Sequence, residues 1–186
     1  QDIRTGFAYQ SVTATSNQVN IEVPPVLASA ITIQGDTLNL GQATNVYMTV
    51  TNNGTADALN VSPGDIYVVN PPSTGGMWAT EGPSPLAQNI PAGEARVFTW
   101  TYSATAVGSV ALSGNASGFD ENSGLKVSSA MNASKYIQVQ LPVQLSASIS
   151  AVPSDVKTGQ PITVYVTANN TGGAAAANVV PSALTL

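Results

Sequence analysis

The residues best suited to chemistry form one short polar run, Asp120-Glu121-Asn122-Ser123. Hard oxygen ligands of this kind suit Ca²⁺, so Asp120, Glu121 and Asn122 are a candidate metal site. The alternative is a polar turn whose Asp and Asn side chains bond the nearby backbone. A glycosidase-type pair is disfavoured because adjacent side chains point apart, whereas that reaction needs two carboxylates facing each other across a cleft.

The sequence contains no histidine and no cysteine. Their absence removes the common zinc sites, histidine-based acid–base catalysis and histidine-dependent triads. It also excludes disulfides. We therefore predict no catalytic residues, no cofactor and no enzymatic activity for this segment.

Asparagines in Asn-x-Ser/Thr sequons are a further kind of candidate site, because such sequons can be glycosylated in secreted proteins. A chain rich in Asn, Ser and Thr also produces sequons by chance, and both readings stay open. The five sequon asparagines are Asn53, Asn60, Asn115, Asn132 and Asn169.

The aromatic residues divide into two groups. Phe98, Trp100 and Tyr102 alternate with polar or small residues, which predicts that they share the buried face of a strand. Trp78 follows Gly75-Gly76, and we predict that it lies in a long Gly- and Pro-rich loop. From such a loop it could contact a neighbouring module or a partner, or it could cap the core.

Charge is scarce, since 8% of the residues are charged and the net charge is −5. The few cations are scattered, which argues against binding to nucleic acid or to an anionic membrane surface. No apolar run is long enough to insert into a membrane. The five basic residues are Arg4, Arg96, Lys126, Lys135 and Lys157.

Alternating apolar and polar residues predict β-strands nearly throughout, and no stretch favours a helix. In 45–51, Val46, Met48 and Val50 share one face. Asn-Gly at Asn53-Gly54 is typical of a turn with positive φ. The alanine run 174–177 is interpreted as a loop. Short strands with frequent turns indicate an all-β fold of immunoglobulin-like β-sandwich modules.

The sequence repeats with a period of 118 residues, because residues 1–68 align without a gap on residues 119–186 (119 − 1 = 118). In this alignment 19 of the 68 pairs are identical, against roughly five expected by chance. A fixed period of this size indicates modules in tandem. We predict the end of one repeat at 1–24, a complete sandwich at 25–142 and the start of the next repeat at 143–186.

The repeat also bears on the calcium alternative. Asp2 aligns with Asp120, but Arg4 takes the place of Asn122. A cation at that position weakens the case for a metal site shared by both copies, so we favour the polar turn.

Residues 45–56, Asn-Val-Tyr-Met-Thr-Val-Thr-Asn-Asn-Gly-Thr-Ala, resemble the V-x-V-T-N-x-G opening of CARDB and related Ig-like repeats of bacterial and archaeal surface proteins. Residues 90–100 and 116–124 are similar to later parts of those repeats. The resemblance implies a β-sandwich, secretion, a tandem arrangement and a structural or adhesive role. It implies no catalytic residues.

We therefore expect a structural segment of a secreted surface protein or extracellular filament, located outside the cell. Its partners would be neighbouring repeats or identical subunits. The alternatives are an adhesin that recognises carbohydrate or a partner cell, and an accessory domain of an enzyme.

Overall fold

A computed structural model describes residue 4 and residues 13–69 and 74–183. These residues form strands and connecting loops, and none of them is in a helix. No segment of this described part is therefore a helix long and apolar enough to cross a membrane. The all-β prediction is confirmed, and the alanine run 174–177 is a loop as predicted.

The largest sheet has four antiparallel strands in the order β1-β3-β8-β6. Its centre is the pairing of β3 with β8, in which Val46 faces Trp100 and Met48 faces Phe98. The strands are β1 (Leu27–Ile33), β3 (Ala43–Asn52), β8 (Ala95–Ala106) and β6 (Gly76–Ser84).

The opposite layer consists of shorter strands in three groups, in the orders β13-β10-β5, β12-β11-β4-β7 and β2-β14-β9. All pairs are antiparallel except β2 with β14. Their bounds are β2 (Thr37–Asn39), β4 (Ala58–Pro63), β5 (Tyr67–Val68), β7 (Gln88–Ile90), β9 (Gly108–Val110), β10 (Leu112–Gly114), β11 (Ala116–Asp120), β12 (Lys126–Ser128), β13 (Asn132–Ala133) and β14 (Ile137–Gln140).

The core lies between these layers and follows the alternation of the sequence. Phe98, Trp100 and Tyr102 are buried on the inner face of β8, as predicted. Val46, Met48 and Val50 are fully buried on β3. Period-two alternation places every second side chain on one face of a pleated strand, so β8 supplies the buried aromatic side chains of the core and β3 packs three large aliphatic ones beside them.

Two local predictions are wrong. Trp78 lies on strand β6 rather than in a loop, and it pairs with Ser103 of β8. Three register shifts interrupt the pairing of β6 with β8, so the strand lacks the clean alternation that would have revealed it. Gly54 does not have positive φ. The structural reason for a glycine there is close approach of another segment, described below.

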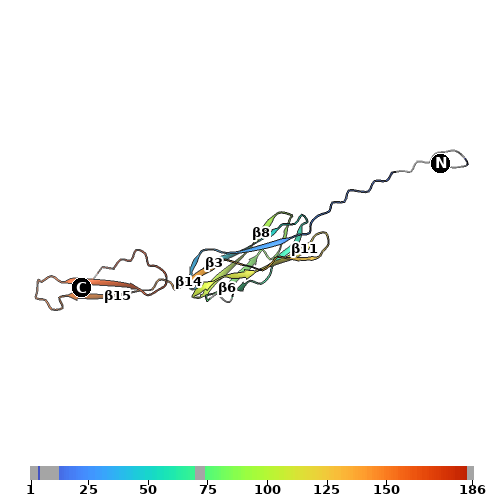
Figure 1. Ribbon diagram of the computed structural model, residues 1–186. Coiled ribbons are helices and arrows are strands. Elements are labelled where there is room, and N and C mark those ends of the chain that lie inside the picture. Colours follow the sequence, from blue (N-terminus) through green and yellow to red (C-terminus); the bar gives the residue numbers. More distant parts are fainter. Residues whose placement is uncertain (1–3, 5–12, 70–73, 184–186) are drawn as a thin grey trace.

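Beyond the sandwich the chain forms a separate hairpin of β15 (Leu145–Val152) and β16 (Thr163–Asn170), drawn in orange and red in Figure 1. The hairpin reproduces β1 and β3 with the same register. Leu27 faces Asn52 in the sandwich, and Leu145 faces Asn170 in the hairpin. Both positions differ by 118 (145 − 27 and 170 − 52).

Identical residues in the two copies differ in exposure. Ile31 of β1 is 4% exposed, whereas Ile149 of β15 is 62% exposed. Leu145 and Val164 are likewise exposed, although Leu27 and Val46 are buried. The hairpin thus corresponds in position and register to two core strands, and in the described residues it has neither the β8 neighbour nor the opposite layer that covers them in the sandwich.

At the other end of the sandwich, residues 13–26 form an extended segment without a strand assignment. Figure 1 shows this segment, in blue, leaving the end of the sandwich that lies away from the hairpin. Val19 and Ile21 in this segment are exposed.

Candidate functional site

One asparagine side chain holds the segment that leads into the sandwich. Asn52, at the end of β3, is fully buried. Its Oδ1 accepts hydrogen bonds from the backbone N–H groups of Val26 (3.2 Å) and Gly54 (3.0 Å). Its Nδ2 donates to the carbonyls of Ala56 (2.8 Å) and Ile90 (3.2 Å). One side chain therefore joins the incoming segment, the turn after β3 and strand β7.

The same turn binds the incoming segment through its backbone. The N–H groups of Thr55 and Ala56 both donate to the carbonyl of Val23 at 3.0 Å, and Val23 N–H donates to Thr55 Oγ1 at 2.7 Å. A Cβ on Gly54 would lie 2.8 Å from Pro25 Cα, so only glycine allows the segment to pass this closely. We call this arrangement the entry clamp: Val23, Pro24, Val26 and residues 52–56.

A second entry clamp is found at residues 141–144 and 170–174. Asn170 Oδ1 accepts from Gln144 N–H (3.2 Å) and Gly172 N–H (3.0 Å), and Asn170 Nδ2 donates to the Ala174 carbonyl (2.7 Å). The N–H of Ala174 donates to Leu141 O at 2.9 Å. Each contact has its counterpart 118 residues earlier, so the repeat is preserved in individual hydrogen bonds.

Sequence reasoning missed the clamp and interpreted 52–55 only as a turn. The available signal was the set of identities between the copies, because Asn52, Gly54 and Ala56 recur as Asn170, Gly172 and Ala174. A buried polar side chain must have partners, but the sequence does not show that the partners belong to the incoming segment.

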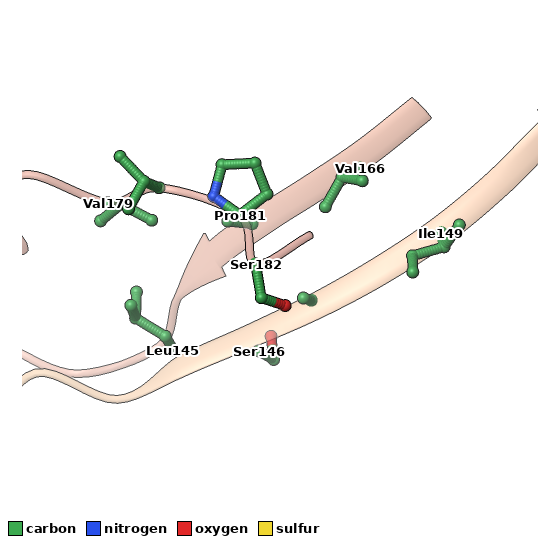
Figure 2. Close-up of a pocket in the computed structure, with 10 residues that line it drawn as sticks. Leu145, Ser146, Ile149, Val166, Val179, Pro181 and Ser182 are labelled. Carbon is green, nitrogen blue, oxygen red and sulfur yellow. The ribbon is translucent and has the colours of Figure 1, made fainter. Parts of the chain in front are cut away.

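The exposed face of the hairpin forms an apolar groove of about 430 Å³. Figure 2 shows Leu145, Ile149 and Val166 projecting from the two strands, with Val179 and Pro181 across from them. Ser146 and Ser182 are the polar residues labelled there. An apolar sheet face of this kind is normally covered by a second layer.

A second hollow, of about 300 Å³, lies beside two exposed aromatic residues of the sandwich. Trp78 of β6 is 72% exposed and Tyr67 of β5 is 54% exposed, and both line it together with Met77 and Leu112. The Tyr67 hydroxyl donates to Asp65 Oδ2 at 3.3 Å, and the charge of Asp65 raises the pKa of Tyr67. Nothing in the spacing of Tyr67 and Trp78 indicated that they lie together.

The candidate calcium residues form a compact polar turn. Both carboxylate oxygens of Asp120 accept hydrogen bonds from within it, from Asn122 N–H (3.1 Å) and Ser123 Oγ (2.6 Å). Glu121 is exposed. In the described part of the chain no three Asp, Glu, His or Cys residues cluster as metal ligands would. Asp2 lies outside the described residues. The calcium alternative stays a prediction.

The five sequon asparagines differ in their surroundings. Asn53, Asn60, Asn132 and Asn169 are exposed. Asn115 is half-buried, and Asn132 donates from Nδ2 to the Ser29 carbonyl at 2.8 Å.

The fold that these strands define is a mostly antiparallel β-sandwich of immunoglobulin-like type, followed by a hairpin that pairs in the register of β1 and β3. Several solved structures are similar to it. A crystal structure of the CARDB domain of a Pyrococcus furiosus protein, in complex with di-metal ions, matches with a TM-score of 0.40 and 18% identity over 67% of this chain and 100% of that chain.

A solution NMR structure of the same CARDB domain matches with a TM-score of 0.36 and 15% identity over 61% of this chain and 95% of that chain. A cohesin module of a Clostridium perfringens family 33 glycoside hydrolase matches with a TM-score of 0.40 and 12% identity, over 62% of this chain and 97% of that chain. CARDB, the family that the sequence motif resembles, is thus among these matches. No protein-family model and no curated relative matches the chain.

Proposed function

We propose that this chain is a structural segment of a secreted, repetitive surface protein or extracellular filament, such as a stalk, sheath or fibre. The observation that carries the proposal is the recurrence of the entry clamp at Asn52 and Asn170. A clamp that fixes the direction in which the chain enters each module limits bending between modules. Modules joined in this way form an extended chain, as a stalk or fibre requires.

The proposal includes the division of the chain. Residues 1–24 are the end of one repeat, residues 25–142 are a complete sandwich, and residues 143–186 begin the next repeat. The paucity of charge and the absence of histidine and cysteine agree with a structural role outside the cell and without catalysis.

Immunogold electron microscopy tests this proposal. Antibodies raised against the purified chain are applied to source cells, with antibody pre-absorbed on the same chain as the control. The proposal expects gold particles outside the cell, along extended structures. Label confined to the cell interior, or on dispersed single molecules, would refute it.

A second candidate function is binding to carbohydrate, and the hollow beside Trp78 and Tyr67 favours it. Exposed aromatic rings are amphipathic and are common at binding surfaces, and Asp65 adds an acceptor for sugar hydroxyls. Glycan-array binding should be lost in Trp78→Ala and Tyr67→Ala. It should be retained in Tyr136→Ala, which removes an exposed tyrosine elsewhere. Equal binding by all three variants would reject this hollow as the site.

A further inference from the structure

A second aromatic hollow of the sandwich adjoins the one beside Trp78 and Tyr67. Its volume is about 430 Å³, which is within the range of small-molecule sites. The two hollows share part of their walls, including Tyr67 and Tyr102. Trp100 lines the second hollow but not the first, and Trp78 lines the first but not the second. We call the second one the Trp100 hollow.

A bulge in β6 leaves space beside the Trp100 indole. Strand β6 bulges at Gly82 and Pro83, and both residues line the hollow. The flanking residues of β6 pair with Thr101 and Thr99 of β8, so no residue of β6 is paired with Trp100 between them. A Cβ on Gly82 would lie 3.0 Å from Trp100 Cδ1, the atom next to the indole N–H. Glycine therefore keeps this edge of the ring uncovered, and bulges of this kind are common beside binding sites.

Two buried side chains bring unpaired polar groups to this hollow. Trp100 is 6% exposed and Tyr102 is 5% exposed. Neither the Trp100 indole N–H nor the Tyr102 hydroxyl hydrogen-bonds to another described residue. Fully enclosed side-chain nitrogens and oxygens in the described part of the chain all have partners, so these two groups must reach the surface. The Trp100 hollow is the one that both side chains line. Buried polar groups normally have partners, and a ligand in this hollow can supply them.

Asp65 adds a hydrogen-bond acceptor to the same hollow. It is exposed, and its Oδ2 accepts a hydrogen bond from the Tyr67 hydroxyl at 3.3 Å. A carboxylate can accept about four hydrogen bonds, so this contact leaves capacity for donors of a ligand. No lysine or arginine is among the described residues that line the hollow. Its only formal charge is therefore negative.

This set of groups selects one class of ligand. The indole N–H needs an acceptor and Asp65 needs donors, so a ligand must offer both. Hydroxyl groups do so, and a sugar ring also has C–H faces that can pack against aromatic rings. An anion would meet the charge of Asp65 without a cation to offset it. An amine cation offers only donors, which the indole N–H cannot accept. A proline-rich segment offers carbonyl acceptors but no proline N–H for Asp65.

We infer that the Trp100 hollow binds a neutral sugar residue. The Trp100 indole N–H and the Tyr102 hydroxyl donate to its oxygens, and Asp65 accepts from its hydroxyls. This inference rests on the second candidate function, carbohydrate binding, and adds to it a subsite with a stated specificity. Because Tyr67 lines both hollows, a glycan can continue from the Trp100 hollow into the one beside Trp78.

Titration of the full chain followed by ¹H–¹⁵N NMR tests the inference, because the sequence contains two tryptophans and therefore two indole N–H signals. Trp78→Phe identifies the signal of Trp100. The neutral probes are the methyl glycosides of glucose, galactose, mannose and N-acetylglucosamine, and the comparison probes are methyl glucuronide and a capped hexaproline peptide. At least one neutral glycoside should shift the Trp100 signal saturably, and neither comparison probe should. No shift with any neutral glycoside, or an equal shift with the glucuronide or the hexaproline, would overturn the inference.

Two conservative variants test the roles of the polar groups. Tyr102→Phe removes one hydroxyl and should weaken binding of the neutral glycoside about fivefold. Asp65→Asn removes the charge at constant size and should weaken it about tenfold, because hydrogen bonds to a charged group are stronger. Tyr136→Phe is the matched control, since it removes the hydroxyl of an exposed tyrosine elsewhere, and it should bind as the wild type does. Wild-type affinity in both Tyr102→Phe and Asp65→Asn would refute the subsite.

The glycan-array variants separate this inference from the second candidate function. Trp78 does not line the Trp100 hollow. Glycan binding that is lost in Trp78→Ala, combined with a Trp100 signal that no neutral glycoside shifts, would refute the subsite and leave carbohydrate binding at the neighbouring hollow intact. Glycan binding that persists in Trp78→Ala, combined with a shifted Trp100 signal, would support the subsite and reject the neighbouring hollow. Immunogold labelling tests the structural role independently of both.

Discussion

Asn52 and Asn170 make the same three hydrogen bonds, each closing a turn onto the segment that enters its module. Asn52 is buried and makes one further hydrogen bond, because its Nδ2 also donates to Ile90 of β7, whereas Asn170 is exposed. The three shared bonds join residues 26 and 52–56, or 144 and 170–174. The clamp therefore forms between neighbouring segments of chain, and β7 adds to it in the complete sandwich.

The first prediction concerns Asn52. In Asn52→Ala four hydrogen bonds are lost and their backbone partners remain in a buried site, so we expect a loss of roughly 3 to 4 kcal/mol in the free energy of unfolding. Urea denaturation monitored by Trp fluorescence measures this loss of stability. Asn53→Ala is the control, because Asn53 is adjacent but exposed. Equal losses in both variants would show that the clamp does not hold the sandwich together.

The second prediction compares two glycines that are required for different reasons. Gly54 lies in a crowded site, whereas Gly93 has a backbone conformation that favours glycine. Gly54→Ala places a Cβ against Pro24 and Pro25, so we expect a loss of about 3 kcal/mol in the free energy of unfolding. Gly93 has φ of +73° and no atom within 4 Å of an added Cβ. Gly93→Ala should therefore cost only about 1 kcal/mol, from conformation alone. Thermal unfolding of both variants tests the order, and the reverse order would contradict the close approach.

The strands were predictable where packing and alternation agree. Phe98, Trp100 and Tyr102 are large, evenly spaced and buried, because β8 is a central strand with regular pairing to β3. Strand β6 was not predictable, because it is an edge strand interrupted by Gly and Pro, and Trp78 faces solvent there. Alternation is a signal of regular burial on one face, so it weakens in β6, where Met77 is buried but most of the later residues are exposed.

Burial was not predictable from local sequence either. Ile31 and Ile149 have identical residue types and equivalent pairing, yet one is in the core and the other is exposed. What differs is the covering layer, which comes from residues distant in the sequence. The same reasoning explains why the hollow beside Tyr67 and Trp78 was not predictable, since these residues lie on different strands.

The third prediction concerns alkaline pH. Burial raises the pKa of the Tyr102 hydroxyl above its usual value of about 10. Between that value and the raised pKa, the unfolded chain has lost the proton and the folded chain still holds it. The free energy of unfolding is therefore unaffected by this group below pH 10 and falls as the pH rises above it, by at most ~1.4 kcal/mol per pH unit.

Tyr102→Phe removes this group, so the decline above pH 10 should become shallower in the variant. Urea unfolding at a series of alkaline pH values measures the slope. Tyr136→Phe serves as the control because it removes the hydroxyl of an exposed tyrosine. A Tyr102→Phe slope that matches the wild type would refute the linkage.

The fourth prediction ranks the sequons by access to the side-chain nitrogen that would carry the glycan. Asn53, Asn60, Asn132 and Asn169 are exposed, but Asn132 Nδ2 is engaged with the Ser29 carbonyl. We expect mass spectrometry of peptides from the native protein to find glycan at Asn53, Asn60 and Asn169. Asn132 and the half-buried Asn115 should be unmodified. Because transfer onto Asn132 would break its contact between β13 and β1, full occupancy there would show that glycosylation precedes formation of the sandwich.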